Sequence, residues 1–273
     1  MLTNILKGMA MGIADLIPGV SGATIAVILR IYQRFILALS NINVNWIICL
    51  YKGNKNKAFI HILRMDPLFL VSVGLGIGIS LLFFSRVVFY FRSTHPELTL
   101  AFFFGLIATS AFFLLKKITF QILPFSIGAL GGMSFLLISS ITLAKTPLLL
   151  FLSGFLAICA MLLPGISGSY VLELIGMYEY ILSLVSQLTQ NPLLSVPLIF
   201  FALGMLPGIL LMAHLGSFLL KHYKQRTYLV LIGLIFGSLL PLGARIGEFS
   251  PSILASVSAG FLVAMLLHWA VLS

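Results

Sequence analysis

Two copies of a Pro-Gly-x-Ser-Gly motif are the residues of this chain best suited to do chemistry. They stand at residues 18–22 and 164–168. The proline ends the incoming helix because it has no N–H group to donate, and the glycine permits a turn and leaves the backbone uncovered. The serine is placed to cap the helix that follows. Each motif therefore predicts a broken helix whose exposed N–H groups could bind an anion.

Hydroxyl and guanidinium groups extend this predicted anion site. Thr24 and Ser169 add hydroxyl donors close to the motifs. Arg30, nine residues after Ser21, could pair with a phosphate group or extend toward the membrane interface. The predicted substrate-binding residues are Pro18, Gly19, Ser21, Gly22, Thr24, Arg30, Pro164, Gly165, Ser167, Gly168 and Ser169.

Two carboxylates lie inside apolar segments next to the motifs. Asp15 precedes Pro18 by three residues, and Glu173 follows Ser167 by six. A charged side chain in hydrocarbon is costly, so each is a functional candidate and could carry a coupling proton. Asp15 could instead cap the facing broken helix.

The composition indicates the medium in which these motifs work. The chain has 273 residues, of which 60% are hydrophobic and 8% charged, and its mean hydropathy is +1.17. A soluble domain carries roughly 25% charged residues. Hydrocarbon must therefore be the solvent, and every backbone polar group must be paired internally. Because the apolar runs are long and lack the alternation of barrel strands, we expect an all-α polytopic membrane protein.

The net charge of +10 has two interpretations. Lys and Arg can anchor cytoplasmic loops, or they can attract an anionic substrate. Nucleic acid is not expected as a partner, because no soluble basic domain is present to bind it. Cys49 and Cys159 are isolated, so we expect neither a disulfide framework nor a metal site, and no cofactor.

The two motifs belong to a plan that occurs twice, a broken apolar segment followed by three spans. Residues of the two copies match without gaps at an offset of 146, as in Tyr32 and Tyr178. The predicted segments are 3–38 with spans 67–90, 98–115 and 121–143, and 148–187 with spans 194–219, 227–243 and 252–271. We expect one membrane domain, 1–273, with repeats over 1–145 and 147–273.

Charge indicates how the two halves are oriented. If each broken segment is a re-entrant hairpin, each half crosses the membrane three times and the second half is inverted. Most Lys and Arg then share one face, including those of a polar connection over residues 41–65, which predicts cytoplasmic termini. Residues 4–17 are also fewer than the roughly 20 that a span needs. Inverted broken helices that meet at the midplane are typical of alternating-access transporters.

Three stretches carry a resemblance to a known family. They are Gly12-Ile13-Ala14-Asp15-Leu16-Ile17-Pro18-Gly19-Val20-Ser21-Gly22, Leu163-Pro164-Gly165-Ile166-Ser167-Gly168-Ser169-Tyr170 and Gly176-Met177-Tyr178-Glu179-Tyr180. With them, nearly the whole chain resembles the bacterial polyprenyl-phosphate transporters. The resemblance implies a flippase that returns undecaprenyl phosphate from the outer to the inner leaflet of the inner membrane. The recovered carrier would again serve peptidoglycan, teichoic acid and other envelope polymers.

Two residues depart from the pattern of that family. Gln33 stands where a glutamate is expected, and Glu173 stands where an apolar residue is expected. Because Gln33 follows Tyr32, the first repeat lacks the tyrosine–acid pair that Tyr178 and Glu179 form in the second, which weakens any role for such a pair. The second makes Glu173 either special to this chain or incidental.

Two other functions stay open from the residues alone. Undecaprenyl-pyrophosphate phosphatases have a similar Pro-Gly-x-Ser motif, but theirs continues with an arginine, whereas Gly22 and Gly168 follow the serines here. Because that arginine stabilises the departing phosphate, we do not expect an enzyme. A transporter of a small anion would suit the same site. Arg86 and Arg92, predicted on the outer side, could also capture an anionic headgroup.

Overall fold

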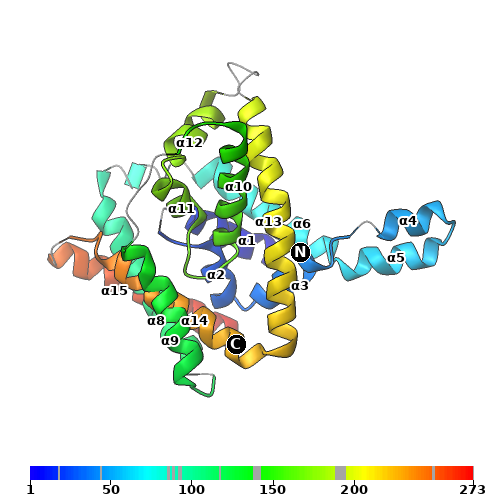
Figure 1. Cartoon of the computed structure of the whole chain (residues 1–273). Coiled ribbons are helices and arrows are strands. Elements are labelled where there is room, and N and C mark those ends of the chain that lie inside the picture. The colour runs from blue at the N-terminus through cyan, green and yellow to red at the C-terminus, as the bar shows by residue number, and fades with distance from the viewer. Residues whose placement is uncertain are drawn as a thin grey trace.

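The chain folds into helices, as the computed structural model in Figure 1 shows. The structure describes residues 1–17, 19–43, 45–84, 87, 90–91, 94–116, 118–137, 143–187, 195–247 and 250–272. These residues contain no strand. The prediction of an all-α protein is therefore confirmed.

The first half contains short helices around the first motif and longer apolar helices after it. Its helices are α1 (Leu2–Asp15), α2 (Gly22–Ile28), α3 (Tyr32–Ser40), α4 (Asn45–Tyr51), α5 (Lys55–Arg64), α6 (Pro67–Ile79), α8 (Pro96–Leu115) and α9 (Ile122–Met133). A π-helical turn over Ser80–Phe84 extends α6. A short 3-10 turn over Ser134–Leu136 follows α9.

The second half repeats this order without the pair α4 and α5 among its described residues. Its helices are α10 (Pro147–Met161), α11 (Gly168–Leu174), α12 (Tyr178–Gln187), α13 (Ser195–His222), α14 (Lys224–Gly243) and α15 (Pro251–Leu272). The bounds of α2 and α11 differ by 146 residues at both ends, which is the offset of the two motifs.

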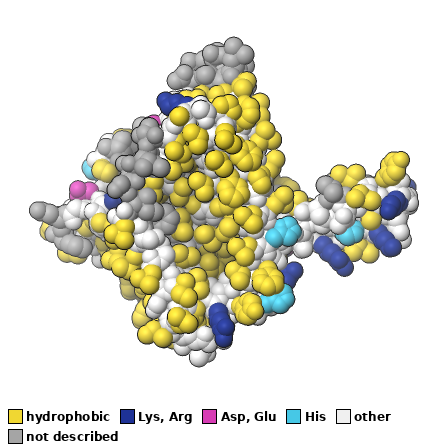
Figure 2. All heavy atoms as spheres, viewed as in Figure 1, with side chains coloured by type: hydrophobic (Ala, Val, Ile, Leu, Met, Phe, Trp, Pro, Cys, Tyr) yellow, Lys and Arg dark blue, Asp and Glu magenta, His cyan; other side chains and the backbone are white. Residues whose placement is uncertain are grey.

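Several of these helices are long and apolar enough to cross a membrane. Within the described residues, four qualify by length and composition: Pro67–Phe84, Pro96–Leu115, Val196–His222 and Lys224–Gly243. Helices α9 and α10 are apolar but shorter. The outer surface is correspondingly hydrophobic, and Figure 2 shows it as a nearly continuous yellow face over the body of the molecule. The protein is thus built as a multi-pass membrane protein.

One predicted span is wrong in its extent. We expected a helix over 121–143, but α9 ends at Met133. Gly131 and Gly132 lie in its last turn, and glycine costs about 1 kcal/mol relative to alanine in a helix. The Ser134 hydroxyl then donates to the Gly131 carbonyl at 2.7 Å, which competes with continuation of the helix.

Each broken segment contains a second break that the sequence prediction missed. Helices α2 and α3 meet at an angle of 117°, with Arg30 between them at φ 57°. Helices α11 and α12 are separated at the equivalent place, where Gly176 has φ 67°. The return half of each hairpin is therefore only seven residues long, and the next helix turns away from it.

The two halves use the same helix contacts. Helix α1 packs on α6 and α10 packs on α13, while α8 packs on α15 and α9 packs on α14. A Cβ atom at Gly8 would collide with the Val73 carbonyl, and one at Gly154 would collide with the Phe201 carbonyl. Val73 and Phe201 are 128 residues apart, fewer than 146 because α4 and α5 are inserted before α6.

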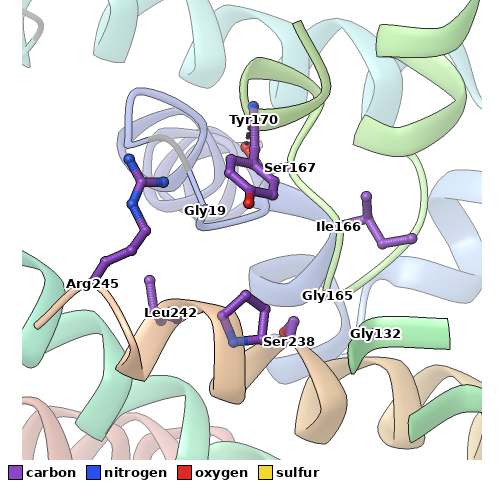
Figure 3. A pocket seen from close by; sticks show the side chains of 10 residues that line it. Gly19, Gly132, Gly165, Ile166, Ser167, Tyr170, Ser238, Leu242 and Arg245 are labelled. Carbon is purple, nitrogen blue, oxygen red and sulfur yellow. Dashed lines mark hydrogen bonds between the residues drawn. The ribbon is translucent and has the colours of Figure 1, made fainter. Parts of the chain in front are cut away.

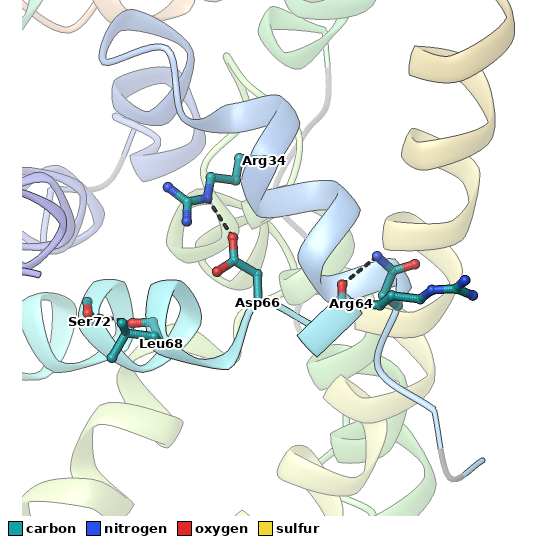
Figure 4. Close-up of polar contacts among 6 residues, drawn as sticks. Arg34, Arg64, Asp66, Leu68 and Ser72 are labelled. Carbon is teal, nitrogen blue, oxygen red and sulfur yellow. Dashed lines mark hydrogen bonds and ion pairs between the residues drawn. The ribbon is translucent and has the colours of Figure 1, made fainter. Parts of the chain in front are cut away.

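Helices α4 and α5 form an arm that projects from the body (Figure 1). The arm carries much of the positive charge of the chain (Figure 2). At its base, Arg34 Nε lies 2.6 Å from Asp66 Oδ2, and the Asn41 side chain donates to the Arg64 carbonyl at 2.8 Å (Figure 4). These contacts join α3 to the start of α6.

Candidate functional site

The tips of the two broken segments touch each other. The Ser21 hydroxyl donates to the Leu163 carbonyl at 3.3 Å. In the other direction, the Gly165 N–H donates to the Thr24 hydroxyl at 2.7 Å. The Tyr32 hydroxyl adds a bond to the Leu162 carbonyl at 3.1 Å. Residues separated by 130 or more positions are thus brought together, and the contact between the two tips agrees with the sequence prediction.

The two serines do not play the same part. Ser167 caps α11, since its hydroxyl accepts from the Tyr170 N–H at 3.4 Å, and it bonds the Ser169 hydroxyl at 2.8 Å. Ser21 makes no cap bond, so its predicted role as a cap is wrong. The cap of α2 is instead Asp15, whose Oδ1 accepts from the Gly22 N–H at 2.7 Å. The Ser21 hydroxyl is therefore free to reach the other tip.

Asp15 also differs from the alternative role predicted for it. It caps the helix of its own hairpin rather than that of the facing hairpin. A carboxylate at a helix N-terminus is favoured by the helix dipole. The aspartate therefore closes the first tip, where a Cβ atom at Gly22 would collide with it.

Burial distinguishes the two tips. Ser21 and Thr24 are 2% and 1% exposed, so the first tip is closed. Ile166 and Ser169 of the second tip are half-buried. The second tip borders a pocket whose lining includes Gly19, Gly165, Ser167, Tyr170, Ser238 and Arg245 (Figure 3). We call it the Arg245 pocket.

Positive φ angles shape both tips beside this pocket. Gly19 has φ 96° and Gly165 has φ 87°, values that favour glycine over residues with a side chain. A Cβ atom at Gly165 would also collide with the backbone of Leu234. The motif glycines therefore allow the tips to turn and to approach α14 closely.

Arg245 is a candidate residue that the sequence prediction missed. By the charge pattern alone, it counts only among the few Lys and Arg expected on the outer face. In the structure its guanidinium carbon lies 5.5 Å from the centre of the Tyr170 ring, and a Cβ atom on Gly19 would lie 3.7 Å from its Nη1. The sequence offered one signal for Arg245, because this arginine follows an apolar helix that contains Pro241 near its end.

Glu173 is paired with this arginine. Its Oε1 lies 3.5 Å from Arg245 Nη2, and the side chains are 40% and 35% exposed. Its Oε2 is buried and has no hydrogen-bond partner among the described residues. Glu173, which lies in an apolar segment of the sequence, therefore has a cation beside it in the structure. The pair places one negative and one positive charge at the rim of the pocket.

The remaining predicted site residues are distributed as follows. Pro164 and Gly168 are buried in the second tip, where a Cβ atom at Gly168 would lie 2.5 Å from the Ala157 carbonyl oxygen. Arg30 does not line the Arg245 pocket, but lines another pocket with Ser110 and His268. The predicted candidates that lie outside the described residues are Pro18, Arg86 and Arg92.

A large apolar groove approaches the second tip from α9, α13 and α14. Its lining includes Ile122, Ile127, Leu219 and Leu234, and Leu163 lies at the tip. Arg226 and Thr227 are polar residues in the same groove. Within the described part of the chain, no three His, Cys, Asp or Glu side chains gather where they could hold a metal ion.

Comparison with known proteins connects this arrangement to a family. The model for the family described as "VCA0040-like: Undecaprenyl phosphate translocase-like" matches residues 11–244. The chain belongs to this family.

Relatives of this translocase-like family agree with that assignment. A protein named polyprenyl-phosphate transporter from Vibrio cholerae serotype O1 is 36% identical over 243 residues, which are 87% of this chain and 76% of that protein. Another of the same name from Staphylococcus aureus (strain NCTC 8325 / PS 47) is 30% identical over 254 residues, 86% of this chain and 84% of that protein. No solved structure matches.

Proposed function

We propose that this protein is a flippase that returns undecaprenyl phosphate from the outer to the inner leaflet of the bacterial inner membrane. The names of the relatives support a polyprenyl phosphate as the substrate. The observation that carries the proposal is the contact of two Pro-Gly-x-Ser-Gly tips beside a pocket with one arginine. The recovered lipid would serve the synthesis of envelope polymers.

The phosphate group would bind in the Arg245 pocket. Arg245 would supply a charge-assisted hydrogen bond. The hydroxyl of Ser167, which lines the pocket and bonds the Ser169 hydroxyl, would supply a further donor. Arg245 already forms an ion pair with Glu173, so an entering phosphate would compete with the Glu173 carboxylate for the guanidinium. The displaced carboxylate would then lose its counter-charge, which would favour its protonation. This exchange would couple a proton to the lipid, with Glu173 as the carrier and Asp15 as the second candidate.

Alternating access would follow from the likeness of the halves. Their helix contacts correspond pair by pair. The second tip contributes Gly165, Ile166, Ser167 and Tyr170 to the lining of the Arg245 pocket, whereas the first tip contributes Gly19. In the alternative state, the first tip would open and the second would close. With the second half inverted and both termini in the cytoplasm, the Arg245 pocket would face outward.

The isoprenoid tail would stay in an apolar environment while the headgroup crosses. The groove over α9, α13 and α14 leads to Leu163 at the second tip. Leu163 also accepts a hydrogen bond from Ser21 of the first tip. A tail in this groove would therefore lie beside the place where the headgroup passes the two tips.

The test is leaflet exchange of undecaprenyl phosphate in liposomes that contain the purified protein. We expect protein-dependent exchange, and we expect a loss of about tenfold or more in Arg245→Gln, since a charge-assisted bond contributes about 1.5–3 kcal/mol. Combined Ser21→Ala and Ser167→Ala should also slow exchange. Arg64→Gln on the arm is the matched control and should exchange at the wild-type rate.

Two results would contradict the flippase. Release of phosphate from undecaprenyl pyrophosphate without leaflet exchange would identify a phosphatase, for which Arg245 would supply the cation that the motif lacks. Uptake of inorganic phosphate without exchange of the lipid would identify a small-anion transporter.

A further inference from the structure

The pocket around Arg30 has no role in the site described so far. It lies between the end of α2, the last part of α8 and the last part of α15. Its polar lining residues are Arg30, Ser110 and His268. The His268 ring stacks on Phe113 with the ring centres 4.2 Å apart. Among the described residues, no carboxylate lines this Arg30 pocket.

The Arg30 pocket corresponds in register to the Arg245 pocket. Gly105 of α8 and Gly233 of α14 are 128 residues apart, and a Cβ atom at either would collide with a carbonyl of the partner helix, that of Val257 and that of Phe125 respectively. These contacts fix which residues of α8 and α14 are equivalent.

With that spacing, two residues of α8 and α14 that line the pockets match. Ser110 corresponds to Ser238, and Leu114 corresponds to Leu242, with each residue in its own pocket. The first half therefore contains a counterpart of the surface that α14 presents to the phosphate.

Arg30 itself is held in an unfavourable backbone conformation. Its φ is 57°, and the equivalent residue of the second half, 146 positions later, is Gly176 with φ 67°. The turn thus suits glycine, and a residue with a side chain there stores strain of the kind that collects at functional sites. The Arg30 side chain is exposed and makes no ion pair with any described residue.

Ser110 supplies an independent sign of a ligand. It is 5% exposed, and its hydroxyl has no hydrogen-bond partner among the described residues. A buried hydroxyl without a partner costs free energy that a bound oxygen acceptor would recover. Lys7, whose Nζ donates to the Leu29 carbonyl at 3.3 Å, adds positive charge next to Arg30.

We propose that the Arg30 pocket is a second binding site for a phosphate monoester, separate from the Arg245 pocket. The guanidinium of Arg30 and the hydroxyl of Ser110 are its donors. No carboxylate is among the described residues that line the pocket, so none competes there for Arg30. If the proposed function holds, this is where the lipid headgroup is held after it passes the two tips.

The experiment follows the reactivity of a cysteine placed at the buried hydroxyl. Ser110→Cys is made with Cys49→Ser and Cys159→Ala, and its modification by methyl methanethiosulfonate is timed in nanodiscs. Undecaprenyl phosphate should slow the modification by about tenfold, as expected for an occupied site. With Arg30→Gly added, the protection should disappear. Arg64→Gln is the control and should keep it.

Further ligands in the same assay separate the sources of the phosphate group. Undecaprenol without phosphate should give no protection. Inorganic phosphate at millimolar concentration should protect only if a free anion is the ligand, and protection by the lipid alone assigns the site to the headgroup. Equal protection by undecaprenol, or protection that persists with Arg30→Gly, would overturn the proposal.

A second measurement guards against a misfolded variant. Arg30→Gly on its own should unfold at the same or a higher temperature than the wild type, since glycine relieves the strain at φ 57°. Its exchange of undecaprenyl phosphate should nevertheless fall about tenfold, and Arg30→Lys should restore part of it. Wild-type exchange in Arg30→Gly would overturn the second site while the flippase itself stood. Absence of exchange in the wild type would overturn the flippase alone.

Discussion

The ion pair between Arg245 and Glu173 makes the charge of the pocket depend on what is bound there. Both side chains are partly exposed, and a pair of this kind contributes about 0.2–1 kcal/mol to stability. A phosphate with two charges can displace a single carboxylate from the guanidinium at small cost. In the proposed function, Glu173 would thus hold Arg245 until the phosphate replaces it.

Removal of that acid should therefore strengthen substrate binding. Glu173→Gln should bind undecaprenyl phosphate up to about fivefold more tightly, because the competing pair of about 1 kcal/mol is lost. Its exchange should no longer respond to an imposed proton gradient. Equilibrium binding in nanodiscs and exchange with and without the gradient are the measurements. Glu179→Gln on α12 is the control, and equal behaviour of the two variants would remove Glu173 from the mechanism.

At the scale of elements, backbone contacts through glycine hold the helix pairs together. A Cβ atom at Gly154 of α10 would collide with the Phe201 carbonyl of α13. A Cβ atom at Gly78 of α6 would have no other atom within 4 Å. The two glycines are both in apolar helices, but only one is at a close crossing. The close crossings hold α1 against α6 and α10 against α13.

The crossing can be tested by adding a methyl group. Gly154→Ala should lower the free energy of unfolding by about 1–3 kcal/mol, because the helices must separate. Gly78→Ala should be neutral or raise it by up to about 1 kcal/mol through helix propensity. Thermal unfolding in detergent measures both. A Gly154→Ala protein as stable as Gly78→Ala would show that α10 and α13 are not tightly packed.

The elements differ in how well the sequence predicted them. Hydropathy and the proline–glycine breaks were sufficient for α8, α14 and both tips, because lipid selects long apolar helices and proline interrupts them. The breaks at Arg30 and Gly176 were missed, since one is an arginine with no turn signal of its own. Arg245 was missed because its place beside Ser167 depends on the packing of α14 against a hairpin far away in the chain.

At the scale of the whole molecule, the inverted arrangement predicts which face each loop occupies. The arm of α4 and α5 should lie in the cytoplasm with both termini, and Lys145 should lie on the opposite face. In cells with Cys49→Ser and Cys159→Ala, Lys145→Cys should react with a membrane-impermeant maleimide. Lys55→Cys should react only after the cells are opened. Reaction of both residues from the same side would contradict the inversion.

The bond between Thr24 and Gly165 has a consequence for the ancestry of the protein. Two matching halves are the usual product of gene duplication, and a single half-length ancestor would have had to pair with a copy of itself. In such a pair the two Pro-Gly-x-Ser-Gly loops would have the same sequence. The sequence could then not assign one loop to hold the other while the other bound a ligand. In the fused chain Thr24 stands opposite Tyr170 in the alignment, and Asp15 opposite Met161. A fused chain can therefore give its two loops different sequences, so that one loop holds the other in place through the bond from Gly165 to Thr24. A pair of identical half-length chains could not encode that difference.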